Sequence, residues 1–304
     1  MAGAERPDVS AGSTSSPTAY LVIAGEAVLL GKQPDGDSVR FRAQRPQLFG
    51  QLEHGDRVDP SADGTVQLRF DGIDAPELHY QSQAQPQGGT ARDALLTQLG
   101  FTAVTFGGNG TTVTGAQPVT VPMVVLSRLV EINGRPVSVV FTGDAATGLA
   151  GADGTWVELD APLLDESVNV WETGQGVAYP LLYTSTAPQL RASFTAAAGG
   201  ARGRGAGVWA QDSSARFSVA DIEAVGPDGA LVLPKLFRRV VDYLRQRGGP
   251  AQTLPQWLAD HPDTEDDDVL VAGAPAVPLH TLLTQDGDTV TLDADVLDLV
   301  FVER

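Results

Sequence analysis

RFDGIDAPELHY, residues 69–80, places one arginine and three carboxylates within nine positions around a glycine and a proline. An alternating run from Thr65 to Phe70 leads into it, with an apolar side chain at every second position, a pattern typical of a strand. Solubility does not require opposite charges to crowd at a turn. The stretch therefore indicates a cation or phosphate site at the end of a strand.

The segments around this stretch have the patterns of further strands and short helices. Asn-Gly at the centre of EINGR, residues 131–135, is typical of a hairpin. Residues 43–63 are predicted to form a long polar loop between two strands. Strands are predicted within 20–30, 34–42, 65–70, 121–131 and 136–143, and helices within 91–100, 166–179 and 189–209. This order predicts a mainly β fold with helices (α+β), namely a small antiparallel barrel with helices packed at one end.

The chain divides into three predicted parts. Residues 1–17 are rich in Ser, Gly and Pro and are predicted to be disordered, 18–214 form the barrel domain, and 215–304 form an acidic C-terminal α/β extension. The extension begins with an amphipathic helix, PKLFRRVVDYLRQRGG, whose apolar side chains share one face and whose arginines lie elsewhere. A second helix, TLPQWLADH, precedes the acidic run at 265–268, which is most simply a solvated loop.

Composition limits the possible functions. The 304 residues are 42% hydrophobic and include no cysteine, which excludes disulfides, zinc thiolate sites and cysteine nucleophiles. No signal peptide and no apolar run of about 18 residues is visible, so we expect a soluble cytoplasmic protein without membrane contact. Secretion stays open if the start codon is misplaced. The net charge of −18 gives no global attraction for nucleic acid, so a polyanionic substrate would need a local cationic site or a bridging metal.

The charged residues of the quoted stretch can each do defined chemistry. Asp74, together with Asp37 in the DGDS turn, supplies the hard oxygen ligands that calcium and magnesium prefer. These two carboxylates would meet at one rim if their strands are neighbours in a barrel. Arg69 can hold two phosphate oxygens, and Glu77 can orient or deprotonate a water molecule. Together they predict metal-assisted phosphodiester hydrolysis.

The order of these motifs resembles that of the staphylococcal-nuclease (thermonuclease) family. The resemblance covers roughly residues 20–212 and rests on DGDSV (35–39), RFDGIDAPE (69–77), GGTARDALL (88–96), NGRPVSVV (133–140), SVNVWETGQGVAY (167–179) and ARGRGAGVW (201–209). It implies a five-stranded OB-fold barrel with helices and calcium-dependent cleavage of DNA or RNA. Residues 43–63 and 101–122 are longer than in compact family members.

The resemblance also implies roles for individual residues. The implied ligands of Ca²⁺ are the carboxylates of Asp37 and Asp74 with the backbone carbonyl of Ala75. Glu77 resembles the general base, and Arg69 and Arg135 resemble the two arginines that hold the phosphate. The candidates for stacking on a substrate base are Tyr179 and Tyr183.

Simpler interpretations compete with each of these roles. The charges around Arg69 could be a structural ion-pair cluster, Arg135 an exposed hairpin residue, and the two tyrosines core or rim aromatics. The second DGD motif, at 286–288, has no Arg…Asp-x-Pro-Glu partner and is expected to be a hairpin turn.

The alternative to a nuclease is a non-catalytic OB-fold module that binds a protein or single-stranded nucleic acid. The acidic C-terminal region could bind a protein partner or cover the site, and we expect a monomer.

Overall fold

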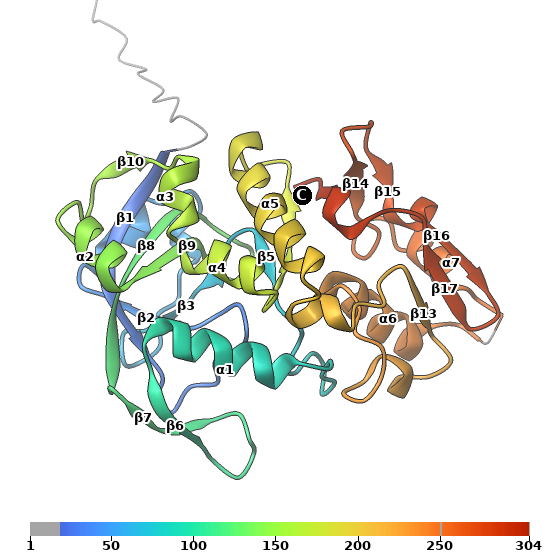
Figure 1. Cartoon of the computed structure of the whole chain (residues 1–304), viewed down its shortest axis with the longest axis horizontal. Helices are drawn as coiled ribbons and strands as arrows, with labels where there is room; N and C mark the ends of the chain where they lie inside the picture. The colour runs from blue at the N-terminus through green and yellow to red at the C-terminus, as the bar shows by residue number, and fades with distance from the viewer. Residues whose placement is uncertain (1–18, 250, 304) are drawn as a thin grey trace, which may run out of the picture.

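A computed structural model describes residues 19–249 and 251–303 of the chain (Figure 1). The N-terminal half is built on a nearly closed, barrel-like sheet in the order β3-β2-β1-β8-β9-β4, with β10 added to β1. Its strands are β1 (Ala19–Val28), β2 (Arg40–Ala43), β3 (Val66–Gln67), β4 (Arg69–Phe70), β8 (Thr120–Val130), β9 (Pro136–Thr142) and β10 (Trp156–Glu158). The predicted mixed α+β class and barrel-like sheet are therefore confirmed.

The sheet nearly closes because the run 66–70 changes partner along its length. Its first part, β3, pairs antiparallel with β2, and its last part, β4, pairs parallel with β9. The N–H of Leu68 donates to the carbonyl of Val39, and the N–H of Phe70 donates to that of Asp37, at 3.0 and 3.1 Å. One predicted strand is thus observed as two short ones, and it links the two edges of the sheet.

Helices cover the sheet and separate it from the C-terminal elements, with α5 between the two in Figure 1. Ser167 caps α4 through a bond from the N–H of Val170, and Gly176 ends that helix in the left-handed conformation. The helices of this half are α1 (Gly88–Leu99), α2 (Gly143–Ala150), α3 (Ala161–Asp165), α4 (Val168–Gln175) and α5 (Pro188–Gly203). A two-stranded ribbon, β6 (Thr102–Phe106) with β7 (Val113–Gln117), extends from the barrel.

The C-terminal elements share a core with the end of the barrel half. They comprise α6 (Pro234–Gln246), α7 (Leu254–Ala259), β13 (Arg216–Ser218), β14 (Asp268–Val271), β15 (Val277–Pro278), β16 (Leu283–Asp286), β17 (Thr289–Leu292) and β18 (Leu299–Phe301). Their core cluster includes Tyr179 and Trp209 from before residue 215. Strand β12 (Leu182–Tyr183) also pairs with β18. The domain boundary near 215 stays a prediction, and side chains from both of its sides pack together.

Two expectations about loops are wrong. The excursion 43–63 is not simply polar, because Leu48, Phe49 and Leu52 are buried in the barrel core. The acidic run is not a solvated loop, because Asp266 and Asp267 are 5% and 6% exposed. These carboxylates pair with His280 and with the two cations Lys235 and Arg239, respectively.

Other expectations are met or lie outside the described residues. The second DGD motif forms the turn between β16 and β17, as expected. The segment predicted to be disordered, 1–17, lies outside the described residues. Within 19–249 and 251–303, no helix has the length and apolar character needed to cross a membrane.

Candidate functional site

Residues 69–80, the RFDGIDAPELHY stretch, turn sharply at Gly72 and place their charges at one end of the barrel. After β4, Gly72 adopts a φ of 76°, and the chain continues into β5 (Ile73–Asp74). A Cβ at this glycine would lie 2.4 Å from the Phe194 ring, so conformation and space both require glycine here. Strand β5 then pairs with β11 (Tyr179–Pro180), with Asp74 opposite Tyr179.

Strand pairing brings Asp37 to the same end of the barrel as Asp74. Asp37 is held beside β4 by its backbone bond to Phe70, and a Cβ on the preceding Gly36 would lie 2.6 Å from the Cβ of Ala75. Burial, followed by the negative charge of Asp74, raises the pKa of Asp37 to about 6, while Arg69 opposes that rise. The two carboxylates predicted to act together therefore interact.

In the loop after Asp74, hydrogen bonds from Gln85 hold the backbone of Glu77 in place. Gln85 accepts a hydrogen bond from the Glu77 N–H at 3.1 Å, and the Gln85 N–H donates to the Glu77 carbonyl at 2.8 Å. A Cβ on Gly88, at the start of α1, would lie 2.6 Å from that same carbonyl oxygen. The Glu77 carboxylate also raises the pKa of Asp37, so it belongs to the same cluster.

An arginine from the C-terminal part completes this cluster. Arg238 of α6 donates from Nη1 to Asp74 Oδ1 at 3.1 Å and from Nη2 to Asp74 Oδ2 at 2.8 Å. It also pairs with Glu77 Oε1. Burial alone would lower the pKa of Arg238, but Asp74 and then Glu77 raise it well above the ordinary arginine value. The guanidinium therefore stays charged and bridges the two carboxylates.

In this arrangement the predicted ligands do not fit a metal ion. Both oxygens of Asp74 accept a bond from Arg238, so a cation shared by these ligands would lie against the positive charge of the guanidinium. Across 19–249 and 251–303, no group of three or more His, Asp or Glu side chains has the arrangement to hold a metal ion. Ala75, the predicted carbonyl ligand, follows Asp74 directly and is buried. This geometry therefore argues against calcium binding at these residues. Calcium as a cofactor stays a prediction.

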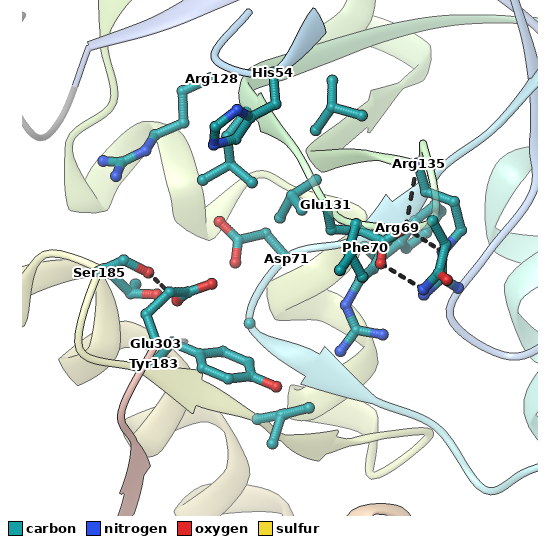
Figure 2. A pocket seen from close by; sticks show the side chains of 18 of the residues that line it. His54, Arg69, Phe70, Asp71, Arg128, Glu131, Arg135, Tyr183, Ser185 and Glu303 are labelled. Carbon is teal, nitrogen blue, oxygen red and sulfur yellow. Dashed lines mark hydrogen bonds and ion pairs between the residues drawn. The ribbon is translucent and has the colours of Figure 1, made fainter. Parts of the chain in front are cut away.

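Arg69 stands between the carboxylate cluster and a cavity. Its charge interacts with Asp37 and Asp74, and its side chain also lines a cavity of about 1080 Å³. Figure 2 shows this cavity, with Arg69, Arg135 and Tyr183 among its walls. Asp37, Asp74 and Glu77 do not line it. The predicted phosphate ligands and the predicted metal ligands thus face different spaces, with Arg69 common to both.

Arg135 is not brought to the carboxylate cluster. Its Nε donates to Glu131 Oε1 at 3.0 Å, four residues earlier in the same hairpin, and its N–H donates to the same oxygen (Figure 2). The side chain is 31% exposed and shares the cavity with Arg69. Arg135 therefore lies where it could contact a ligand held by Arg69, but it is paired within its own hairpin.

The two candidate tyrosines lie in different environments. Tyr179 is 0% exposed, its hydroxyl donates to Asp212 at 2.9 Å, and its ring packs edge-on against Trp209 with centroids 5.1 Å apart. No face of this ring is open to a base, so Tyr179 occupies a core position and cannot stack on substrate in this conformation. Tyr183 is half-buried and lines the cavity, where it packs against Phe301.

Sequence reasoning missed Arg238, Asp35 and Glu172. Asp35 lies in the DGD turn, and burial with the charge of Asp37 raises its pKa to about 7. Glu172 in α4 is fully buried and neither of its carboxylate oxygens has a hydrogen-bond partner. One signal for Glu172 was available, because it lies four residues after Val168 on the face of α4 that packs inward. For Arg238 the only signal was the group of arginines in PKLFRRVVDYLRQRGG, within a C-terminal extension that is otherwise acidic.

Comparison with known proteins adds no relative to this description. No protein-family model matches the chain, and no curated protein matches it.

Proposed function

We propose that the chain hydrolyses phosphodiester bonds in DNA or RNA, at a site formed by Asp37, Asp74, Glu77 and Arg69. The observation that carries the proposal is the meeting of these four side chains at one end of the barrel, from segments that strand pairing brings together. Three carboxylates that interact beside a half-buried guanidinium are costly to assemble for stability alone. An acid with a raised pKa in such a cluster, as at Asp37, is typical of catalytic sites.

The connectivity of the sheet supports the finer fold assignment within this proposal. An OB-fold barrel has five strands, and here β1, β2, the run 66–70, β9 and β8 follow one another around the sheet. The run 66–70 is antiparallel to β2 and parallel to β9. We therefore propose that the barrel is of the OB type found in the staphylococcal-nuclease family.

The proposed reaction uses the chain's own residues in three roles. Glu77 accepts a proton from a water molecule, whose oxygen attacks phosphorus while the bond to the leaving oxygen breaks, and the leaving oxygen takes up a proton from solvent water. Arg69 holds the nonbridging phosphate oxygens as negative charge develops on them, and Arg135 would join it after separating from Glu131. Glu77 can act as a base only when Arg238 has released its carboxylate.

Cleavage of labelled single-stranded DNA and RNA tests this proposal. The assay compares the full chain and an Arg238→Gln variant, each with calcium and with chelator. We expect calcium-dependent cleavage, faster in the variant, and loss of that cleavage when Glu77→Gln is added. Absence of cleavage in both proteins, or equal cleavage with chelator, would remove the proposal.

A second candidate is a non-catalytic OB-fold binding module. One observation favours it: Arg238 neutralises the predicted base and the predicted metal ligand at the same time. With a net charge of −18, a protein partner at the acidic C-terminal region is then a better fit than nucleic acid. Calcium-independent binding of a strand or protein by a variant that never cleaves would support this candidate. A monomer in the cytoplasm is expected under both proposals.

A further inference from the structure

The guanidinium of Arg238 is bonded to Asp74, which the resemblance implies as a metal ligand, and to Glu77. We propose that its guanidinium replaces a divalent cation between Asp74 and Glu77, so that cation binding and docking of α6 on the 74–85 loop exclude each other. The inference concerns cation binding, and it rests on the proposed function only for what the freed site would do.

The contacts of Arg238 explain why a cation and this guanidinium cannot share the carboxylates. Asp74 is 1% exposed, and both of its oxygens accept bonds from Arg238 in a forked arrangement. Glu77 accepts a further bond from Nη1. A cation bound between these two carboxylates would need the space that the guanidinium occupies and would lie against its positive charge. Asp37 also interacts electrostatically with this guanidinium.

The carboxylates repel one another, so the cluster is stable only with positive charge beside it. A cation or a guanidinium is therefore expected between Asp74 and Glu77. Asp35, Asp37, Asp74 and Glu77 form one electrostatic cluster, in which Asp37 interacts with the other three carboxylates. Arg69 supplies one positive charge from the barrel side. Without Arg238, the cluster would lose one of the two positive charges that face it and would attract a cation from solution.

A second group of contacts holds α6 against the loop that carries Glu77. Asp242, one turn after Arg238, accepts bonds from the Tyr80 hydroxyl and from Gln81 Nε2, both at 2.6 Å. Gln85 Nε2 donates to the carbonyl of Val232 at 2.7 Å, just before the helix. Burial and the bond to Asp242 raise the pKa of Tyr80 to about 12. The helix is therefore fixed on this loop on both sides of Arg238, and the guanidinium is held in place.

Calcium titration of the full chain by calorimetry tests the inference. Wild type is compared with Arg238→Gln and with Arg216→Gln, a control that removes the same charge from an exposed position on β13. We expect Arg238→Gln to bind one calcium ion and wild type and the control to bind far more weakly. In wild type, calcium must displace the hydrogen bonds of Arg238, whereas in Arg238→Gln it does not. The calcium dissociation constants should therefore differ by about 10- to 100-fold for each charged hydrogen bond displaced.

Thermal unfolding keeps the test decisive if Arg238→Gln folds poorly. In that case calcium should raise its melting temperature, and Arg238→Lys, which keeps one charge but not the fork, should show an intermediate calcium effect. Wild type should show a much smaller rise in melting temperature. Equal calcium affinity in wild type and Arg238→Gln, or no calcium effect on any of the variants, would overturn the inference.

The outcome is separable from that of the proposed function. If Arg238→Gln binds calcium but cleaves no nucleic acid, the exclusion stands and the nuclease proposal fails. If wild type binds calcium and cleaves as fast as the variant, the nuclease proposal stands and the exclusion is overturned.

Discussion

Arg238 and Asp74 lie 164 positions apart in the chain and form a forked ion pair, with both guanidinium–carboxylate bonds at 3.1 Å or less. Asp74 sits on β5, just after the barrel strand β4, whereas Arg238 sits on α6 of the C-terminal part. The pair joins the two parts of the chain at the charged turn 69–77, where the sequence predicts a cation or phosphate site. It therefore connects the stability of the molecule with the state of its candidate site.

Replacing Arg238 by Gln should destabilise the chain in the absence of divalent cations. The change leaves the buried Asp74 without its counter-ion, and removal of one partner from a buried pair costs about 3–5 kcal/mol. Urea unfolding at pH 7 in chelator measures the loss. Arg216→Gln should stay within about 0.5 kcal/mol of wild type, as is usual for exposed positions. Equal losses in the two variants would show that the pair does not stabilise the fold.

The same variant should recover stability as the pH falls. Burial and Asp74 raise the pKa of Asp37 to about 6 even though Arg238 opposes the rise, so removing Arg238 should raise that pKa further. An acid whose folded-state pKa is raised binds protons more tightly when folded, and stability then increases on acidification through that range. The free energy of unfolding of Arg238→Gln should therefore lie closer to that of wild type at pH 5 than at pH 7. A deficit that is constant with pH would contradict this.

Glu77→Gln, placed in an Arg238→Gln background, should reduce the cleavage rate by about 10²–10⁴-fold and leave substrate binding nearly unchanged. A glutamine keeps the size of the side chain but cannot accept the proton of the attacking water. Single-turnover cleavage and fluorescence anisotropy separate the two quantities. Glu166→Gln, at an exposed position beyond α3, is the matched control and should change neither. A similar loss of binding and rate would indicate a structural role for Glu77.

The sequence predicted those parts of the site that depend on local pattern and on pairing of nearby strands. The DGD turn and the run 66–70 are neighbours in a β ladder, so the meeting of Asp37 with Asp74 follows from alternation and turn chemistry. The hairpin at 131–135 and the stop of α4 at Gly176 follow from the same local rules. These features need no knowledge of how distant segments pack.

The features that sequence could not predict depend on packing between distant segments. Periodicity shows that the arginines lie off the apolar face of α6, but it does not show that Arg238 reaches Asp74 on β5. Tyr179 and Tyr183 lie on adjacent two-residue strands, where a shift of one residue exchanges core for cavity. Pairing of the acidic run with Lys235 and Arg239 likewise depends on where α6 docks.

Tyr179→Phe should lower stability without changing nucleic-acid binding. The change removes the hydroxyl that donates to Asp212, a bond of about 1 kcal/mol, and leaves the packing against Trp209 intact. Tyr183→Leu is the matched comparison, because its ring lines the cavity beside Arg69, and this variant should weaken binding. Urea unfolding and anisotropy with single-stranded DNA measure both effects. Weaker binding in Tyr179→Phe than in Tyr183→Leu would contradict the core position of Tyr179.

Glu172→Gln should stabilise the chain at neutral pH and have little effect near pH 4. Glu172 is fully buried, its carboxylate oxygens have no hydrogen-bond partner, and burial followed by the charge of Asp37 raises its pKa well above the ordinary value of 4.5. The folded state therefore binds this proton more tightly than the unfolded state. Between those two pKa values each pH unit costs wild type about 1.4 kcal/mol, and a glutamine does not titrate. Urea unfolding from pH 4 to pH 8 should show a steeper decline for wild type than for Glu172→Gln, with Glu166→Gln following wild type. Parallel curves for wild type and Glu172→Gln would mean that the buried acid has found a partner or a cation.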